Sequence, residues 1–307
     1  MPGDERRLRP GGPAVSAMGL GLAALGRPAY ITGGRARDLP DRSVAGLRAR
    51  TFAVLDAAYA AGIRYADAAR SYGRAEEFLA EWLAAPGHPG LVAGSKWGYR
   101  YTGGWRLDAS QHEAKEHSRA AFTAQFAQTT ALLGGRLALY QVHSLTPDSP
   151  LLGDRELLAA LGDLRDRGVL LGVSTSGPHQ ADVLRRALEA SAGGRPLFGA
   201  AQVTWNVLEP SVGAAAAEAA AAGWAVLVKE ALANGRLAPG APDARPLAAL
   251  AAGRGVGEDA IALAAALANP WATVVLSGAV STAHLHANLA ALTVGDVAVP
   301  PGLAEPP

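Results

Sequence analysis

Residues 44–84, VAGLRARTFAVLDAAYAAGIRYADAARSYGRAEEFLAEWLA, contain one complete helix–strand–helix unit. The pattern over Val44–Ala61 is that of an amphipathic helix, and Gly62 follows it as a helix-ending glycine does. The apolar run Ile63–Asp67 predicts a strand, and Ala75–Ala84 predicts the next helix. Because the strand is apolar throughout, we expect it to be a parallel strand covered by helices.

The same unit recurs along the chain with short breaks between the elements. Apolar runs predict eight strands, at Ala17–Leu22, Ile63–Asp67, Leu91–Lys96, Leu137–His143, Leu170–Ser174, Ala200–Thr204, Ala225–Lys229 and Thr273–Ser277. Helical patterns lie between or after them, at Val44–Ala61, Ala75–Ala84, Glu116–Leu133, Asp154–Arg167, Gln180–Ala190, Val212–Ala222, Arg245–Arg254, Glu258–Ala268 and Ala283–Ala291. Eight βα repeats without a break in composition predict an α/β protein with a single-domain (β/α)8 TIM barrel.

The barrel is expected to span residues 16–295. Residues 1–15 are charged and rich in Pro and Gly, and they predict a flexible N-terminal segment, while residues 296–307 predict a C-terminal tail. Two further segments rich in Gly or Pro, 26–43 and 97–115, are predicted to be either lids or disordered loops.

A doubly wound sheet with a dinucleotide fingerprint is the alternative fold. Gly19, Gly21 and Ala24 match the spacing G-x-G-x-x-A. That motif requires a helix directly after it, with the helix N-terminus on the pyrophosphate. Residues 25–43 instead read as a loop, so the barrel is favoured and the glycines are interpreted as a tight loop at a strand end.

The bulk composition argues against several classes of function. The 307 residues carry a net charge of +1, and only 18% are charged, so no basic face for nucleic acid or anionic lipid is indicated. Without cysteine the chain forms no disulfide or thiolate metal site, and no metal centre is expected. The apolar run near the N-terminus is too short for a membrane span and lacks a secretory layout. We therefore expect a cytoplasmic enzyme.

Four polar residues at or near strand ends are the candidate catalytic group. Asp67, Lys96 and His143 end three successive predicted strands, and Tyr72 follows Asp67 by five residues. In a (β/α)8 barrel the C-terminal ends of the strands face one shared site. Each residue alone is more simply explained as a cap, turn or loop residue, but the four together indicate one site.

Lys96 is informative because the chain has only three lysines, at positions 96, 115 and 229, among its 28 basic residues. A buried lysine can shift its pKa or polarise a hydroxyl group, whereas arginine does not readily lose its proton. A phenol coupled to a lysine that is tied to a carboxylate makes a general acid that works near neutral pH.

The chain resembles the aldo-keto reductase family over residues 18–292. The family's signature around its first catalytic pair is similar to Gly62–Gly73, GIRYADAARSYG. Its third-strand lysine corresponds to Lys96 in GSKWG, and its histidine segment corresponds to His143 in QVHS. The resemblance implies hydride transfer between a nicotinamide cofactor and a carbonyl or alcohol.

The resemblance also implies a role for each catalytic residue. Tyr72 would give its proton to the developing alkoxide, and Lys96, anchored by Asp67, would stabilise the tyrosinate. His143 would orient and polarise the carbonyl oxygen. The cofactor would carry the hydride chemistry, while the protein supplies geometry and electric field.

The same resemblance implies a set of cofactor-binding residues. Ser174 and Thr175 stand where the family has the Ser-Asn pair that holds the nicotinamide carboxamide. Lys229 begins the loop over the pyrophosphate, although a lysine merely paired with Glu230 at the barrel rim is the alternative. The full set is Ser174, Thr175, Gln202, Lys229, Leu232, Gly235, Gly278, Ser281, His284 and Asn288.

NADP is the cofactor expected from the resemblance, with NAD as the alternative. Many family members place Lys or Arg at the adenosine end to bind the 2′-phosphate. This chain has neither between Leu276 and Leu292, where His284 is the candidate cation. Arg236 on the seventh-strand loop is a second candidate.

The expected partner is a small carbonyl or alcohol substrate, and the family's habit predicts a monomer or weak homo-oligomer. Aromatic residues cluster after the third strand, and Trp97, Tyr99 and Trp105 are the candidate substrate walls. Such walls suit sugars, quinone-like rings or other flat carbonyl compounds, although the same residues could pack the loop onto the barrel.

Two other function classes remain open at this point. A barrel that binds nicotinamide as a sensor or subunit without turnover would keep the cofactor segments and lose the catalytic groups. An aldolase or isomerase could use Lys96 to form a Schiff base with its substrate.

Overall fold

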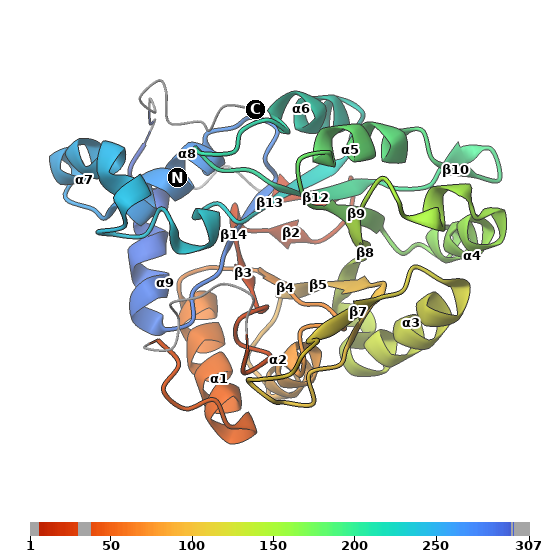
Figure 1. Cartoon of the computed structure of the whole chain (residues 1–307), viewed down its shortest axis with the longest axis horizontal. Helices are drawn as coiled ribbons and strands as arrows, with labels where there is room; N and C mark the ends of the chain where they lie inside the picture. Colours follow the sequence, from red (N-terminus) through yellow and green to blue (C-terminus); the bar gives the residue numbers. More distant parts are fainter. Residues whose placement is uncertain (1–5, 30–37, 296, 298–307) are drawn as a thin grey trace.

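A computed structural model describes residues 6–29, 38–295 and 297 of the chain. Eight parallel strands form a closed barrel in the order β12-β13-β14-β3-β4-β5-β8-β9, and β9 pairs with β12 to complete the ring (Figure 1). These strands are β3 (Met18–Gly21), β4 (Tyr65–Asp67), β5 (Val92–Trp97), β8 (Leu137–Leu145), β9 (Leu171–Thr175), β12 (Ala200–Thr204), β13 (Ala225–Lys229) and β14 (Val274–Ser277). The predicted single-domain (β/α)8 barrel is confirmed.

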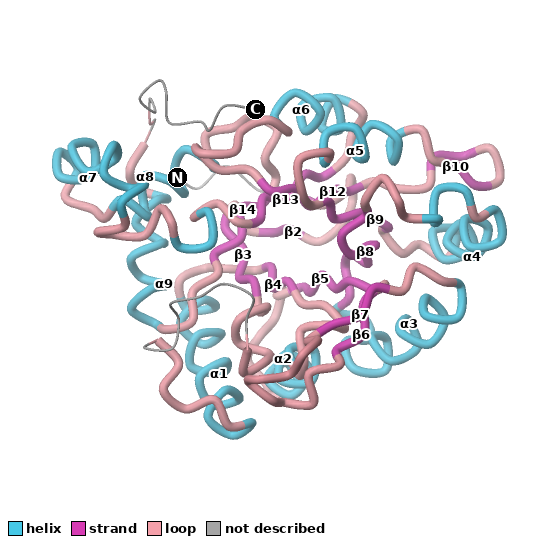
Figure 2. The backbone as a smooth tube through the Cα atoms, viewed as in Figure 1, coloured by secondary structure: helices cyan, strands magenta, loops and turns pink. Residues whose placement is uncertain are grey.

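Helices surround this barrel (Figure 2). The α-helices are α1 (Val44–Ala60), α2 (Ala75–Ala84), α3 (Arg119–Leu133), α4 (Arg155–Asp166), α5 (Gln180–Leu188), α6 (Gly213–Ala221), α7 (Ala248–Arg254), α8 (Glu258–Leu267) and α9 (Thr282–Leu289). Short 3-10 segments are η1 (Gly134–Arg136), η2 (Pro150–Gly153), η3 (Ala233–Gly235), η4 (Pro242–Leu247) and η5 (Ala290–Leu292). Helix α3 begins later than predicted because Ser118 caps it, accepting the Ala121 N–H.

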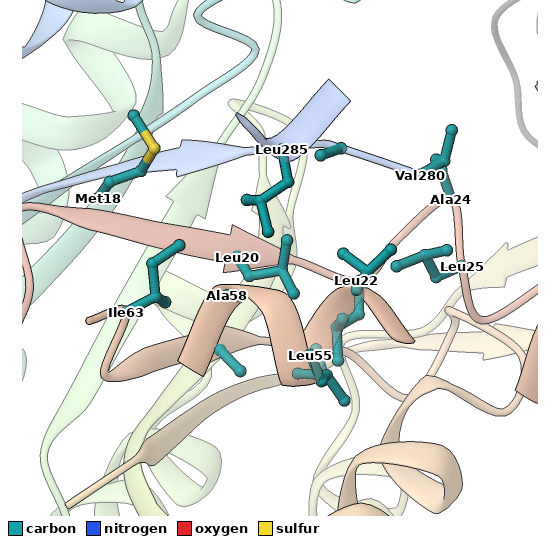
Figure 3. Close-up of a cluster of buried hydrophobic side chains, with 14 of the residues drawn as sticks. Met18, Leu20, Leu22, Ala24, Leu25, Leu55, Ala58, Ile63, Val280 and Leu285 are labelled. Carbon is teal, nitrogen blue, oxygen red and sulfur yellow. The ribbon is translucent and has the colours of Figure 1, made fainter. Parts of the chain in front are cut away.

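Apolar side chains fix the first barrel strand to the first helix. Leu20 and Leu22 are fully buried, and they share one cluster with Leu55 and Ala58 of α1 (Figure 3). Each large aliphatic side chain buried in this way contributes about 1.5–3 kcal/mol relative to exposure. The same packing fixes the direction in which β3 delivers its C-terminal end to the barrel mouth.

The glycines of the alternative dinucleotide motif lie inside β3 and not in a loop. A Cβ at Gly19 would lie 2.9 Å from the side chains of Val274 and Leu276. A small residue is therefore required where neighbouring strands crowd the barrel interior. Gly19 thus serves the closed barrel, and the doubly wound alternative is excluded.

An antiparallel hairpin covers the N-terminal end of the barrel. It pairs β1 (Arg6–Arg7) with β2 (Ala14–Val15). Leu8 and Val15 are buried in a cluster with residues from the beginnings of barrel strands, including Ala200 and Ala225. The expected flexible segment at residues 1–15 thus contains an ordered hairpin over 6–15, because two apolar side chains cover strand ends that would otherwise meet water. Residues 1–5, and all but residue 297 of the expected C-terminal tail, lie outside the described residues.

The candidate lid at 97–115 contains a second hairpin, β6 (Tyr99–Tyr101) with β7 (Glu113–Lys115). Trp105 in its connecting loop donates its Nε1–H to the backbone oxygen of Arg42 at 2.9 Å, which ties the hairpin to the start of α1. A third hairpin pairs β10 (Ser191–Ala192) with β11 (Arg195–Pro196). Of the other candidate lid, residues 30–37 lie outside the described residues. Across the part of the chain that is described, no helix has the length and apolar character needed to cross a membrane.

Candidate active site

The four candidate catalytic residues meet at the C-terminal mouth of the barrel. Asp67 ends β4, Lys96 is the penultimate residue of β5, His143 lies in β8, and Tyr72 lies between β4 and α2. Because β4, β5 and β8 are neighbours in the barrel, their ends deliver these side chains to one place. Asp67, Tyr72 and His143 line a cavity of about 780 Å³, and Lys96 is fully buried.

The Lys96 ammonium directs its three hydrogens at three oxygen atoms. Nζ donates to Asp67 Oδ2, to the backbone oxygen of Ala68 at 3.0 Å and to the Tyr72 hydroxyl at 3.4 Å. Burial lowers the pKa of Lys96, and the Asp67 carboxylate acts in the opposite direction. A compact ammonium suits this arrangement, whereas a planar guanidinium would not.

Asp67 is buried and receives further hydrogen bonds besides that from Lys96. Its Oδ1 accepts from Gln202 Nε2 at 2.9 Å and from the Tyr65 hydroxyl at 3.4 Å. Gly94 on β5 makes room for Tyr65, because a Cβ there would lie 1.9 Å from the phenolic oxygen. Sequence reasoning missed Tyr65, although residues two apart on a strand share a face and the YAD run therefore places it beside Asp67.

His143 is held as a neutral imidazole. Burial lowers its pKa well below the usual value, and nearby cations, Lys96 first, act in the same direction. Its Nδ1 lies 3.3 Å from Ser71 Oγ, and its ring meets the Tyr72 ring edge-on with centroids 5.4 Å apart. With Nδ1 at the Ser71 hydroxyl, Nε2 is the nitrogen left for the cavity that His143 lines, where a neutral ring can donate a hydrogen bond.

The backbone next to His143 is fixed from two sides. Ser144 has φ +49°, a left-handed conformation that is uncommon outside glycine. Its N–H donates to Ser174 Oγ at 2.8 Å, and its Oγ accepts from Ser176 Oγ at 3.0 Å. His117, which sequence reasoning also missed, contacts the backbone oxygen of His143 through Nε2 at 2.8 Å. The Ser174 and His117 contacts hold the backbone at His143 and Ser144 in place.

Most of the residues predicted to bind cofactor line the same cavity as the candidate catalytic residues. Those in the lining are Gln202, Lys229, Leu232, Gly235, Gly278, His284 and Asn288. The other three do not line it: Ser174 and Thr175 are buried at the end of β9, and Ser281 caps α9 by accepting the His284 N–H at 3.1 Å. Thr175 directs its hydroxyl to Gln180 Oε1 at 3.4 Å, so its polar atom points to a protein partner.

Lys229 lines the cavity and is also paired within the protein. Its Nζ donates to Glu230 Oε1 at 2.8 Å and to Thr204 Oγ1 at 2.5 Å. These contacts agree with the alternative interpretation, in which Lys229 is paired with Glu230 at the barrel rim. A phosphate contact by Lys229 would have to compete with these partners.

The end of the cavity near α9 carries several carboxylates. His284 Nε2 lies 4.0 Å from Asp38 Oδ1, and burial raises the pKa of Asp259 in the same lining. Arg236, the second candidate cation, is paired with Asp243 at 2.7 Å. Both candidate cations for a 2′-phosphate thus stand beside acidic side chains.

The three aromatic residues predicted to form substrate walls lie in three different environments. Trp97 is fully buried, and it packs on Phe122 with ring centroids 5.1 Å apart, so it belongs to the core and does not line the cavity. The reason is strand alternation: Lys96 turns into the barrel, and its neighbour turns outward. Trp105 packs against Phe78 of α2 with centroids 6.4 Å apart, which holds the loop onto the barrel. Of the three, Tyr99 lies beside the candidate catalytic residue His143, with ring centroids 5.0 Å apart, but it does not line the cavity.

Arg27 and Glu113 are among the charged residues in the cavity lining that sequence reasoning missed. Arg27 follows β3, Glu113 begins β7, and their side chains form an ion pair of 2.8 Å. Their only sequence signal is position, since each lies in a loop segment expected at the barrel mouth. Within residues 6–29, 38–295 and 297, no group of three or more acidic or histidine side chains is arranged to hold a metal ion.

The fold is a closed (β/α)8 barrel, and four polar side chains meet at its C-terminal mouth. The family model for the aldo/keto reductase family matches residues 18–296. The chain therefore belongs to the aldo/keto reductase family. It is an oxidoreductase that acts on a carbonyl compound or the corresponding alcohol.

Solved structures with the same fold are similar over nearly the whole chain. An aldo-keto reductase from Bacillus halodurans, solved in its holo form, has a TM-score of 0.70 at 21% identity, with 94% of this chain and 90% of that chain covered. The glycerol dehydrogenase from Gluconobacter oxydans has a TM-score of 0.68 at 22% identity, with coverage of 95% and 90%. No curated protein sequence matches the chain significantly.

Proposed function

We propose that the chain is an NAD(P)H-dependent reductase of aldehydes, ketones or sugars in which Tyr72 is the proton donor. The observation that carries this proposal is the contact of Lys96 Nζ with both Asp67 and the Tyr72 hydroxyl, beside a neutral His143 in a large cavity. A phenol, a buried ammonium and a neutral imidazole at one oxygen-binding position suit carbonyl reduction. The cytoplasmic location and the monomeric or weakly oligomeric state stay predictions from the sequence.

The cavity suits a nicotinamide dinucleotide by size and by the chemistry of its lining. Its volume of about 780 Å³ is in the range of cofactor sites. The amides of Gln202 and Asn288 lie in the lining, and a Cβ at Gly278 would meet nothing within 4 Å, so the backbone there is open to a ligand. We propose Gln202 for the nicotinamide carboxamide, Gly235 and Lys229 for the pyrophosphate, and His284 with Asn288 for the adenosine end.

The protein's own groups then handle the proton and the developing charge. The bound cofactor supplies the hydride. Tyr72 passes its hydroxyl proton to the carbonyl oxygen as that oxygen becomes an alkoxide, and Lys96 stabilises the phenolate left behind. His143 donates the Nε2–H to the same oxygen, which orients the carbonyl and stabilises its charge.

The Schiff-base alternative is disfavoured by the surroundings of Lys96. Its Nζ is fully buried and already directed at Asp67, Ala68 and Tyr72. A substrate carbon would have to displace these contacts to reach the amine. The alternative of a cofactor-binding sensor is disfavoured because all four catalytic groups are assembled in one place.

One experiment separates the three functions. Binding of NADPH and NADH is measured by tryptophan fluorescence, and oxidation of each is then followed with a panel of aldehydes, ketones and sugars. Borohydride is added with each carbonyl in the absence of nucleotide, and adducts on Lys96 are sought by mass spectrometry. Binding with turnover supports the proposal. Binding without turnover on any carbonyl would support the sensor, and a trapped Lys96 adduct would support the Schiff-base enzyme.

A further inference from the structure

The cavity wall next to Tyr72 carries an ion pair that belongs to no step of the proposed mechanism. Arg27 is only 2% exposed, yet it lines the cavity, and its guanidinium carbon lies 5.6 Å from the centre of the Tyr72 ring. Its Nη1 donates to Glu113 Oε2 at 2.8 Å and to the backbone oxygen of Ser71 at 3.2 Å. Glu113 lines the same cavity from hairpin β6–β7 and is 21% exposed.

Two hydroxyl groups line the cavity beside His143. Ser144 and Ser176 both belong to the lining, and their Oγ atoms lie 3.0 Å apart. Ser144 directly follows His143 in the chain and has a left-handed backbone conformation, with φ +49°. Holding a non-glycine residue in that conformation costs about 1–3 kcal/mol, which the surrounding hydrogen bonds offset.

Arg27 and Lys229, two basic residues of the cavity lining, are each paired with a carboxylate. Arg27 is matched by Glu113, and Lys229 is matched by Glu230 at 2.8 Å. An anionic substrate would therefore have to compete with a protein carboxylate for its cation. These two ion pairs offer hydrogen-bond donors and acceptors without a net charge.

Two of the three aromatic side chains predicted to form substrate walls pack elsewhere. Trp97 is in the core and Trp105 packs on α2. A substrate without polar groups would cover the ion pair and the two hydroxyls without replacing the hydrogen bonds that water makes with them, and such desolvation is unfavourable. Substrate hydroxyl groups would replace those bonds.

We infer that Arg27 and Glu113, together with Ser144 and Ser176, select neutral carbonyl substrates that carry hydroxyl groups next to the carbonyl. This inference rests on the proposed reductase function and narrows its substrate class. A site that hydrogen-bonds a substrate hydroxyl discriminates strongly against the analogue that lacks it, while a purely apolar pocket discriminates weakly.

Three aldehydes of similar length test the inference with the holoenzyme. Glyceraldehyde carries two hydroxyls, 2-methylbutanal replaces both by methyl groups, and succinic semialdehyde carries a carboxylate. We expect kcat/KM for glyceraldehyde to exceed that for 2-methylbutanal by about 100-fold, a moderate value for hydroxyl recognition. Equal or reversed kcat/KM values would overturn the substrate inference alone, whereas no turnover of any carbonyl would overturn the reductase proposal itself.

Variants of Glu113 and Ser176 test whether these residues determine the preference among the three aldehydes. Glu113→Gln removes the carboxylate that pairs with Arg27, so kcat/KM for succinic semialdehyde should rise about 10-fold relative to glyceraldehyde. A merely structural role of Glu113 would lower all three values together, and that result would overturn the assignment. The control is Glu116→Gln, which removes a neighbouring carboxylate that pairs with Arg100 outside the cavity lining.

Ser176→Ala provides a second test that does not depend on the ion pair. We expect kcat/KM for glyceraldehyde to fall by about 10-fold and that for 2-methylbutanal to stay unchanged, since only the former uses the hydroxyl. Fluorescence and circular dichroism spectra matching the parent confirm that the variant is folded. Unchanged values for both aldehydes would remove Ser176 from the inferred recognition wall.

Discussion

Lys96 Nζ lies 3.4 Å from the hydroxyl oxygen of Tyr72, although 24 residues separate them in the chain. The contact exists because β4 and β5 are neighbours in the barrel and both end at its mouth. The same ammonium contacts Asp67, so a phenol, a cation and a carboxylate form one linked group. The first two predictions follow from this group.

Replacement Tyr72→Phe removes the proposed proton donor and leaves the ring in place. We expect kcat to fall by roughly 100-fold or more, the usual effect of losing a general acid. The dissociation constant of NADPH, measured by fluorescence, should change little. Tyr59→Phe is the matched control, because its hydroxyl donates to the Pro89 backbone on the protein surface. Turnover near the parent value in Tyr72→Phe would contradict the mechanism.

Replacement Lys96→Arg keeps a positive charge but changes its shape. A planar guanidinium does not direct three hydrogens at Asp67, Ala68 and Tyr72 as the ammonium does. We expect kcat to fall at least 100-fold in a protein whose far-UV circular dichroism is unchanged. Lys115→Arg, at an exposed position, should retain the parent rate. If Lys96→Arg reacts normally, any cation is sufficient at this position.

His117 should make stability depend on pH. Burial lowers the pKa of His117 to about 4, whereas the unfolded chain has a histidine pKa of about 6.5. Between these values the unfolded state binds the extra proton, so the contribution to stability is complete above pH 6.5 and is lost as pH falls toward 4. One such histidine lowers the free energy of unfolding by about 2 kcal/mol between pH 7 and pH 5.

Urea unfolding at the two pH values checks this prediction. In His117→Asn, the difference in unfolding free energy between pH 7 and pH 5 should shrink by about 2 kcal/mol. His286→Asn is the control, because His286 is exposed on α9. The prediction fails if His117→Asn and the parent show the same pH dependence.

The carboxylates near α9 should weaken any preference for NADPH. The 2′-phosphate requires a cationic partner, but His284 lies 4.0 Å from Asp38. We expect the dissociation constants of NADPH and NADH to differ by less than about 10-fold. Asp38→Asn should shift the ratio toward NADPH, and His284→Ala should shift it toward NADH.

Both dissociation constants are measured by fluorescence titration, with His286→Ala as the control for loss of a histidine from α9. A strong NADPH preference that neither Asp38→Asn nor His284→Ala alters would show that another residue binds the phosphate. The expectation of NADP from family resemblance would then hold with a different phosphate-binding residue.

Several features could be read from the sequence because they depend on local patterns. Apolar runs of strand length separated by amphipathic runs repeat along the whole chain, and a covered parallel strand has this pattern wherever it lies. The placement of Asp67, Lys96 and His143 near strand ends followed from the same runs. Once the barrel is assumed, neighbouring strand ends must meet, so the meeting of these candidate catalytic residues could be predicted without coordinates.

Only the tertiary structure decided which side chains contact one another across the barrel. Asp67 accepts from Gln202, which is 135 residues away, and Arg27 pairs with Glu113 at a separation of 86 residues. Such contacts depend on the order of the strands and on how each loop folds over the mouth, and no local pattern encodes them. Trp97 is a further example. As an aromatic residue after the third strand it was predicted to form a substrate wall, but it is buried in the core. Successive strand residues point to opposite faces, so Trp97 points outward where Lys96 points into the barrel.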